Sequence, residues 1–468
     1  MKIVETRVLE GPNLFLLEPA VKIEFASDSE TLSDDERRRL DRLAELVVEL
    51  HAASGLDAPR VVLEPLEIPS HVALAYSWTH RHFATAIAEM IGEALISGAD
   101  ASTFEDRAIS ILAEVDEDDK PHMVSDAART KLTIGVTGTN GKTTTTRLIA
   151  HLFSHAGRHV GWSCSSGVYI DGSQVLSGDY SGPQGAQRVL EDPVVEVAVV
   201  ELARGGILLK GIACQSLDVS VFTNISTDHL DLQGIRTIRG LARAKSVVSR
   251  ITRAGGFAVV NADDPLVMES TEGIVAERVL ISRNSQNPVL GQHLAGGGKA
   301  LVYEADALIW HDGIGEERLA QVVDVPMTYG GAAGFMVENA LAGAAAALMA
   351  GLSLLEVRRG LATFDNSSDM NPGRLNVFEV DGTTVVLDFA HNEVGLQVLL
   401  DFARSLKGEA GEIFSVVGTA GDRTDESIRE LGRIAALSSD HIIAKDTKKY
   451  LRGREAADLL KLYADGAH

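Results

Sequence analysis

The stretch GTNGKT at residues 138–143 constrains the fold of this chain more than any other part of its sequence. An apolar run at residues 132–136 precedes it, and a helical pattern at residues 146–153 follows it. Glycines allow backbone N–H groups to close around phosphate oxygens, and the N-terminus of a helix adds positive potential there. In such a loop Lys142 reaches the outer phosphates and the hydroxyl of Thr143 binds Mg²⁺. The sequence therefore predicts a buried strand, a phosphate-binding loop and a helix in direct succession.

The match to the general phosphate-binding loop is incomplete. That pattern has a glycine five residues before Gly141, and this chain has Val136 there. An ordinary tight turn before a helix is the alternative interpretation, but such a turn needs no Lys-Thr pair at its end. We therefore expect a variant of the phosphate-binding loop.

The patterns on either side of the loop predict several domains, as the length of 468 residues also favours. Apolar runs alternate with helical patterns over residues 131–367, which is typical of a mostly parallel sheet with helices on both faces. The same pattern begins again in residues 368–468 and predicts a smaller, Rossmann-like α/β domain. Residues 1–120 predict a small α+β domain, and a linker is expected at residues 121–130.

Composition disfavours several classes of protein. The net charge is −23, and a surface this acidic repels phosphate backbones, so no nucleic acid partner is expected. No apolar run approaches the roughly 20 residues that cross a bilayer, and the N-terminus lacks a signal-peptide pattern. We therefore expect a cytoplasmic protein without a membrane partner. Cys164 and Cys214 stand apart from any metal-binding pattern, which predicts small core residues rather than a disulfide framework or a zinc site.

The variant loop resembles that of the Mur ligase superfamily, and further motifs follow in that family's order. Glu201 ends an apolar strand in VVELARGG, and TNISTDHLD at residues 223–231 follows another strand. The resemblance implies a Mur ligase-like fold and an enzyme that uses ATP to turn a carboxylate into an acyl-phosphate and join it to an amino acid. It also implies that Thr143, Glu201 and His229 hold Mg²⁺. Without the resemblance, His229 is a capping or surface histidine. The loop residues expected to bind ATP are Gly138, Thr139, Asn140, Gly141, Lys142, Thr143 and Thr144.

Residues outside the loop complete the expected site by the same resemblance. Lys245 matches a lysine that these ligases carbamylate, and a solvated helix lysine is the alternative. Asn339 matches an asparagine that contacts the adenine. Arg374 would reach the γ-phosphate from the hinge before the last domain, and Asp388 would contact the ribose or orient that arginine. The residues expected to act in catalysis are Lys142, Glu201, His229, Lys245 and Arg374.

A finer resemblance is to the Mur-like module of the cyanophycin synthetase family, carried by residues 199–208, 371–376 and 421–435. In that family the module adds arginine to the side chain of a polymer-bound aspartate. The start of the chain resembles that family's N-terminal domain, but the linker leaves no room for its ATP-grasp domain. We therefore do not expect this chain alone to extend a polyaspartate backbone. The C-terminal domain is expected to be truncated, because the family's last domain continues through at least one more helix and strand.

Other functions stay open at this point. One is a Mur-type ligase of another peptide precursor, such as that of pseudomurein, and another is a nucleotide-binding regulatory subunit that does not ligate. A role on UDP-sugar substrates is disfavoured, because the N-terminal region lacks the Rossmann-like domain that binds them in peptidoglycan ligases. The identity of the amine and of the carboxylate is open, and so is assembly as a homo-oligomer.

Overall fold

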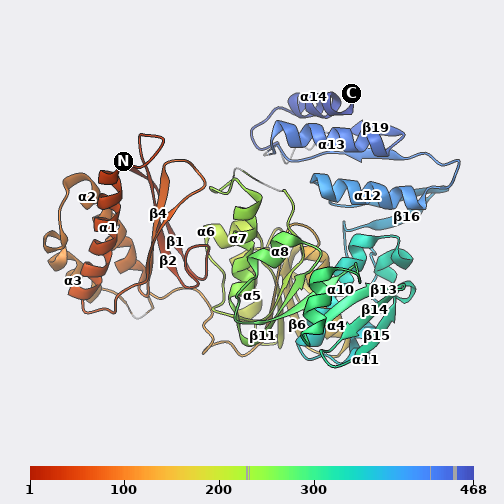
Figure 1. The fold of residues 1–468 in the computed structure, drawn as a ribbon, viewed down its shortest axis with the longest axis horizontal. Coiled ribbons are helices and arrows are strands. Elements are labelled where there is room, and N and C mark those ends of the chain that lie inside the picture. The colour runs from red at the N-terminus through yellow and green to blue at the C-terminus, as the bar shows by residue number, and fades with distance from the viewer. Residues whose placement is uncertain (117, 228–229, 231, 422, 446–450) are drawn as a thin grey trace.

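The computed structural model describes residues 1–468 except residues 117, 228–229, 231, 422 and 446–450. Figure 1 shows the N-terminal elements in red and orange beside the large central region, with the C-terminal helices in blue above the right-hand part of that region. Within the described residues, no helix is both long enough and apolar enough to cross a membrane.

The N-terminal region is a four-stranded antiparallel sheet covered by helices. Its strand order is β1-β2-β4-β3. Helix α1 begins at a capping box, because Ser33 and Glu36 each bond the other's backbone N–H. The elements are β1 (Lys2–Leu9), β2 (Ala20–Ala26), α1 (Asp34–Ala53), β3 (Val61–Pro65), β4 (His71–Ser77), α2 (Arg81–Ser97), a short 3₁₀ turn η1 (Ala101–Thr103) and α3 (Glu105–Ala113).

The described residues of the central region contain one large sheet. Its strand order is β15-β14-β13-β12-β11-β10-β5-β9-β6-β7-β8. Its strands are β5 (Leu132–Thr137), β6 (Val160–Cys164), β7 (Gly167–Ile170), β8 (Ser173–Ser177), β9 (Val197–Glu201), β10 (Leu217–Phe222), β11 (Thr252–Asn261), β12 (Glu277–Ser282), β13 (Ala300–Glu304), β14 (Ala307–His311) and β15 (Glu316–Gln321). The stretch from β13 to β6 is parallel, and antiparallel pairs extend it at both ends. The predicted mostly parallel sheet is therefore confirmed, and the antiparallel extensions add to it.

Helices cover both faces of this sheet, as expected when its strands are continuous apolar runs. In β9, Val199 packs with α4, α10 and α11, whereas its neighbours Ala198 and Val200 pack on the opposite face with α5, α6 and α7. The helices are α4 (Lys142–His155), α5 (Pro183–Glu191), α6 (Arg204–Leu209), α7 (Ile238–Arg250), α8 (Pro265–Ser270), α9 (Pro288–Ala295), the 3₁₀ turns η2 (Val322–Asp324) and η3 (Pro326–Gly331), α10 (Gly334–Met349) and α11 (Leu354–Leu361).

The C-terminal region joins helices to two short strand pairs. Strands β16 and β17 are antiparallel, and β18 and β19 are parallel. Leu396, Ile428, Leu431 and Leu462 from the three helices form its core. The elements are β16 (Asn376–Val380), β17 (Thr383–Leu387), α12 (Glu393–Leu406), β18 (Phe414–Val417), α13 (Asp425–Ser438), β19 (His441–Ala444) and α14 (Ala456–Ala467). The exact domain boundaries stay a prediction.

Both cysteines are buried and free, as predicted. Cys164 ends β6, and Cys214 lies just before β10. Burial raises the pKa of the Cys214 thiol to about 12. A thiol with so high a pKa carries almost no thiolate at neutral pH, so we expect Cys214 to be unreactive.

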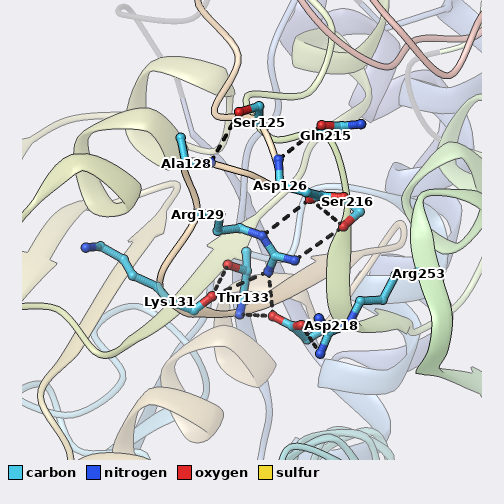
Figure 2. Close-up of polar contacts among 10 residues, drawn as sticks. All are labelled: Ser125, Asp126, Ala128, Arg129, Lys131, Thr133, Gln215, Ser216, Asp218 and Arg253. Atoms are coloured by element: carbon cyan, nitrogen blue, oxygen red, sulfur yellow. Dashed lines mark hydrogen bonds and ion pairs between the residues drawn. The ribbon is translucent and has the colours of Figure 1, made fainter.

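A buried ion pair attaches the segment before β5 to the base of the central sheet (Figure 2). Asp218, near the start of β10, accepts hydrogen bonds from Arg129 Nη1 at 2.5 Å and from the Thr133 backbone N–H at 2.7 Å. Arg253 forms a second ion pair with Asp218 at 2.7 Å, and Asp126 accepts a bond from Ser216 on the other side of Arg129. The network fixes where the chain enters the central region.

Asp218→Asn should lower the free energy of unfolding by about 3 kcal/mol, because it removes the buried carboxylate that the Arg129 guanidinium contacts at 2.5 Å. Only 5% of the Arg129 side chain is exposed, so water cannot replace the lost partner. The measurement is urea-induced unfolding followed by circular dichroism. Asp126→Asn is the control, because Asp126 is 45% exposed and lies 3.6 Å from Arg129 Nε, so its loss should cost less than about 1 kcal/mol. Equal effects of the two variants would contradict this account.

Candidate active site

The candidate site lies where the carboxyl ends of neighbouring parallel strands β9, β5 and β10 meet the N-terminus of α4. The loop at residues 138–141 makes this turn with left-handed backbone at Gly138 (φ 143°) and Gly141 (φ 85°). An added Cβ would lie 1.9 Å from Thr223 Oγ1 at Gly138 and 2.2 Å from Asn339 Oδ1 at Gly141. Both positions therefore require glycine for conformation and for space. The predicted strand, loop and helix are confirmed.

Two residues directly after β10, Thr223 and Asn224, hold the loop in shape. Asn224 accepts hydrogen bonds from the Thr139 N–H through its carbonyl, at 2.8 Å, and from the Asn140 N–H through its side chain, at 2.9 Å. The Thr223 hydroxyl donates to the Asn140 carbonyl at 2.7 Å. These bonds preorganise the loop, whereas the first N–H groups of α4 have no acceptor inside the helix. A phosphate-binding cradle has this form.

Two lysines contact backbone carbonyls of the loop. Lys142 Nζ donates to the Thr139 carbonyl at 2.8 Å, and Lys245 Nζ donates to the Gly138 carbonyl at 2.6 Å. Lys245 comes from α7 and only 5% of it is exposed, so it is not the solvated helix lysine of the alternative interpretation. Carbamylation of Lys245 stays a prediction.

Oxygen ligands gather beside the loop. The Thr143 hydroxyl donates to Glu201 Oε2 at 2.9 Å and lies 3.1 Å from the Ser165 hydroxyl. The Ser165 N–H donates to the same Glu201 oxygen at 3.2 Å, and Glu201 is buried. The structure thus brings together two of the three predicted metal ligands, while His229 lies outside the described residues. Within the described part of the chain, no group of three His, Cys, Asp or Glu side chains forms a metal site.

The residues present fit Mg²⁺ and a nucleotide. Hydroxyl and carboxylate oxygens are the ligands that Mg²⁺ prefers, and it keeps several waters rather than requiring a complete protein cage. Thr143 and Glu201 supply such oxygens next to a glycine loop at the N-terminus of a 14-residue helix. The assignment of these residues to ATP and Mg²⁺ stays a prediction.

Arg374 reaches this cluster from the segment that leads into the C-terminal region. Its Nη2 donates to the Ser165 hydroxyl at 3.1 Å and to Thr143 Oγ1 at 3.3 Å. Its guanidinium also lies over the ring of Phe389, 4.9 Å from the centroid. An arginine in this place puts positive charge beside the predicted phosphate position.

Asp388 supports the arginine through the backbone. Its Oδ2 accepts a hydrogen bond from the Leu375 N–H at 2.7 Å, and Leu375 has the unusual φ of 52°. Burial raises the pKa of Asp388, although the nearby Arg374 charge lowers it. These contacts favour the orienting role among the two that the sequence left open for Asp388.

Asn339 lies beneath the loop, next to Gly141 and within 3.5 Å of the Thr145 hydroxyl. Its predecessor Glu338 accepts a hydrogen bond from Asn224 at 3.0 Å, and burial raises the pKa of Glu338. The adenine contact expected of Asn339 stays a prediction.

Sequence reasoning missed several polar residues at this site. Ser165 follows β6 just as Glu201 ends β9, so its place at a strand end was the available signal. Asn392, the N-cap of α12, bonds Asn140 of the loop at 2.9 Å and joins the C-terminal region to it. Asn392 follows residues 388–391 (DFAH) rather than the end of a strand, so the sequence offered no comparable signal for it.

Comparison with known protein families identifies two ligase domains in this chain. Residues 136–347 match the Mur ligase middle domain, and residues 373–468 match the glutamate ligase domain of Mur ligases. Together the two matches span well over half of the chain. The chain belongs to the Mur ligase family. The glycine loop, Glu201 and Asn339 lie within the first match, and Arg374 and Asp388 lie within the second.

Individual relatives agree with this placement in the Mur ligase family. Cyanophycin synthetase of Synechocystis sp. is 43% identical over 329 residues, which are 70% of this chain and 37% of that protein. UDP-N-acetylmuramyl-tripeptide synthetase of Deinococcus radiodurans is 29% identical, over 71% of this chain and 65% of that protein. This chain thus spans little more than a third of the cyanophycin synthetase that it matches.

A solved structure supports the Mur ligase fold. E. coli FolC in complex with DHPP and ADP superposes with a TM-score of 0.54 and 21% identity, over 72% of this chain and 80% of that chain. At this identity the likeness establishes the α/β fold alone. The predicted fold class is confirmed.

Proposed function

We propose that the protein is an ATP-dependent carbon–nitrogen ligase that joins the carboxylate of one substrate to the amine of an amino acid. One observation carries the proposal: Arg374 from the second ligase domain contacts Thr143 of the glycine loop at 3.3 Å, beside Glu201. A reaction centre built from both domains suits an enzyme that brings a nucleotide and two further substrates together.

The chemistry follows from these positions. The loop and Lys142 would hold the phosphates, and Thr143 and Glu201 would hold Mg²⁺, which would neutralise charge during phosphoryl transfer. An oxygen of the substrate carboxylate attacks the γ-phosphorus, the bond to ADP breaks, and an acyl-phosphate forms. Arg374 stabilises the charge on the transferred group. The amine then attacks the acyl carbon, phosphate leaves, and the amine loses a proton to give the amide.

Arginine and the side chain of a peptide-bound aspartate are the substrates that we propose. The support is the 43% identity to cyanophycin synthetase over 70% of this chain. The other peptide ligases and the non-ligating regulatory subunit remain as alternatives that the assay below separates. A cytoplasmic location stays a prediction.

An assay of phosphate release with ATP and Mg²⁺ tests the proposal. Each amino acid is supplied with and without short aspartyl peptides, including β-aspartyl-arginine chains. We expect release that requires both arginine and an aspartyl acceptor, together with a product whose mass has increased by one arginine residue. Release with another amine would favour a different peptide ligase. ATP binding without any release would favour the regulatory subunit.

The acid side of the pH profile should depend on Asp388. Because its pKa is raised, its carboxylate becomes protonated at a higher pH than an ordinary aspartate does. The neutral form then holds the Leu375 N–H more weakly and loses its attraction to Arg374. We expect kcat/KM to fall as pH decreases through this pKa. Asp388→Asn should abolish this fall. It should also lower the plateau of kcat/KM about tenfold, which corresponds to the typical contribution of a hydrogen bond to a charged group. An unchanged acid limb in this variant would contradict the assignment.

A further inference from the structure

A carboxylate of the N-terminal region lies at the beginning of helix α7 in the central region. Glu67, in the turn after β3, accepts hydrogen bonds from the Thr237 N–H at 2.8 Å and from the Thr237 hydroxyl at 2.6 Å. It also accepts a bond from the Arg236 N–H. A Cβ added at Gly240 would lie 1.9 Å from Glu67 Oε1, so α7 has a glycine where this carboxylate approaches.

These contacts satisfy groups that α7 itself cannot satisfy. Thr237 is the N-cap of α7, and its hydroxyl oxygen accepts from the Gly240 N–H at 3.0 Å. Glu67 adds negative charge at the positive end of the helix dipole. Burial pushes the pKa of Glu67 up, but the bonds from Thr237 and Arg236 bring it below the ordinary glutamate value. Glu67 therefore stays ionised at the end of α7.

The same helix carries Lys245 about two turns further along. Lys245 is buried, and its ammonium donates to the Gly138 carbonyl at 2.6 Å. An unbroken series of contacts thus runs from Glu67 through α7 and Lys245 to the glycine loop. Because α7 packs against β5 and β10, the strands next to the loop, a shift of the N-terminus of α7 would move Lys245 relative to the loop.

We propose that Glu67 is a positioning residue through which the N-terminal region sets the shape of the glycine loop and so the affinity for nucleotide. The proposal rests on the proposed function only in that the loop binds ATP. It gives the N-terminal region, which lies outside both matched ligase domains, a role in the same site.

Glu64 provides a matched control. It lies in β3, three residues before Glu67, and it also reaches α7, through an ion pair with Arg243. Arg243 lies on the side of α7 rather than at its end, and 48% of its side chain is exposed. Loss of the Glu64 contact therefore removes one contact between the two regions but leaves the helix cap intact.

Calorimetric titration of the full chain with a non-hydrolysable ATP analogue and Mg²⁺ tests the proposal. Glu67→Gln should weaken binding about tenfold, within the usual range of coupling between sites. Glu64→Gln should change binding less than about twofold, as expected of an exposed ion pair. Glu67→Asp, which keeps the charge, should recover most of the affinity. Circular dichroism identifies any variant that does not fold.

A double-mutant cycle separates positioning from a general loss of stability. If Glu67 acts through Lys245, then Glu67→Gln should have little further effect on binding in a Lys245→Met background. Additive losses, or unchanged affinity in Glu67→Gln, would overturn this proposal alone. Failure of the unaltered protein to bind the analogue would overturn both this proposal and the proposed function.

Discussion

Glu201→Gln should lower the rate of phosphate release by at least about a hundredfold, because a metal ion contributes several kcal/mol of transition-state stabilisation. The substitution keeps the size of the side chain but removes the negative charge that Mg²⁺ requires. The Glu201 carboxylate is buried and accepts bonds from Thr143 and Ser165, and glutamine still accepts through its one amide oxygen. The loss should therefore reflect metal binding rather than misfolding.

The control for this variant is Glu196→Gln. Glu196 precedes β9, at the opposite end from Glu201, and it accepts a bond from the His159 N–H at 3.1 Å. Glu196→Gln should leave the turnover rate within about twofold of that of the unaltered protein, like most surface substitutions. Steady-state rates measured over a range of Mg²⁺ concentrations should show a higher requirement for Mg²⁺ in Glu201→Gln only. An unchanged requirement would remove Glu201 from the metal site.

Arg374→Ala should reduce kcat by about a thousandfold, the lower end of the effect of an arginine that stabilises a transferred phosphoryl group. The arginine contacts Thr143 and Ser165, and it comes from the second ligase domain. The KM for ATP should change only a few fold, because the glycine loop and its lysines keep their contacts.

Arg404→Ala is the control for this arginine. Arg404 lies on α12 in the same domain and pairs with Asp401 on the surface, so its removal tests the loss of a positive charge alone. Its kcat should equal that of the unaltered protein. If Arg374→Ala instead raised the KM for ATP and left kcat intact, Arg374 would bind the ground state and not the transition state.

Much of the site could be predicted because its central part is local in sequence. The strand, the glycine loop and the helix are consecutive, and the backbone conformation of Gly138 and Gly141 follows from that succession. Glu201 could be predicted because a carboxylate at the carboxyl end of a parallel strand meets its neighbours at one edge of the sheet.

The remaining contacts depend on tertiary packing, which periodicity does not report. Asn224 shapes the loop through both its backbone and its side chain, and its role becomes visible only when β10 lies next to β5. Asn392 bonds Asn140 across 252 residues of chain. The antiparallel pairs at the two ends of the central sheet were not predicted either, because short half-exposed strands carry a weak alternation signal.

The sequence predicts more of the fold than of the substrates. Strand and helix patterns predicted the mixed α/β character of the chain, because those patterns reflect burial on one or two faces, but the four-stranded antiparallel sheet of the N-terminal region was not predicted. The pocket for the amine depends on a few side chains with no fixed spacing, and the sequence offers no rule that locates them.

Transfer of oxygen from the carboxylate substrate to phosphate tests the central claim most directly. An aspartyl peptide with ¹⁸O at both oxygens of its side-chain carboxylate is incubated with ATP, Mg²⁺ and arginine, and the released phosphate is analysed by mass spectrometry. An acyl-phosphate predicts one ¹⁸O atom in each phosphate released during amide formation. Phosphate without ¹⁸O, while ATP is consumed and amide forms, would contradict the proposed mechanism.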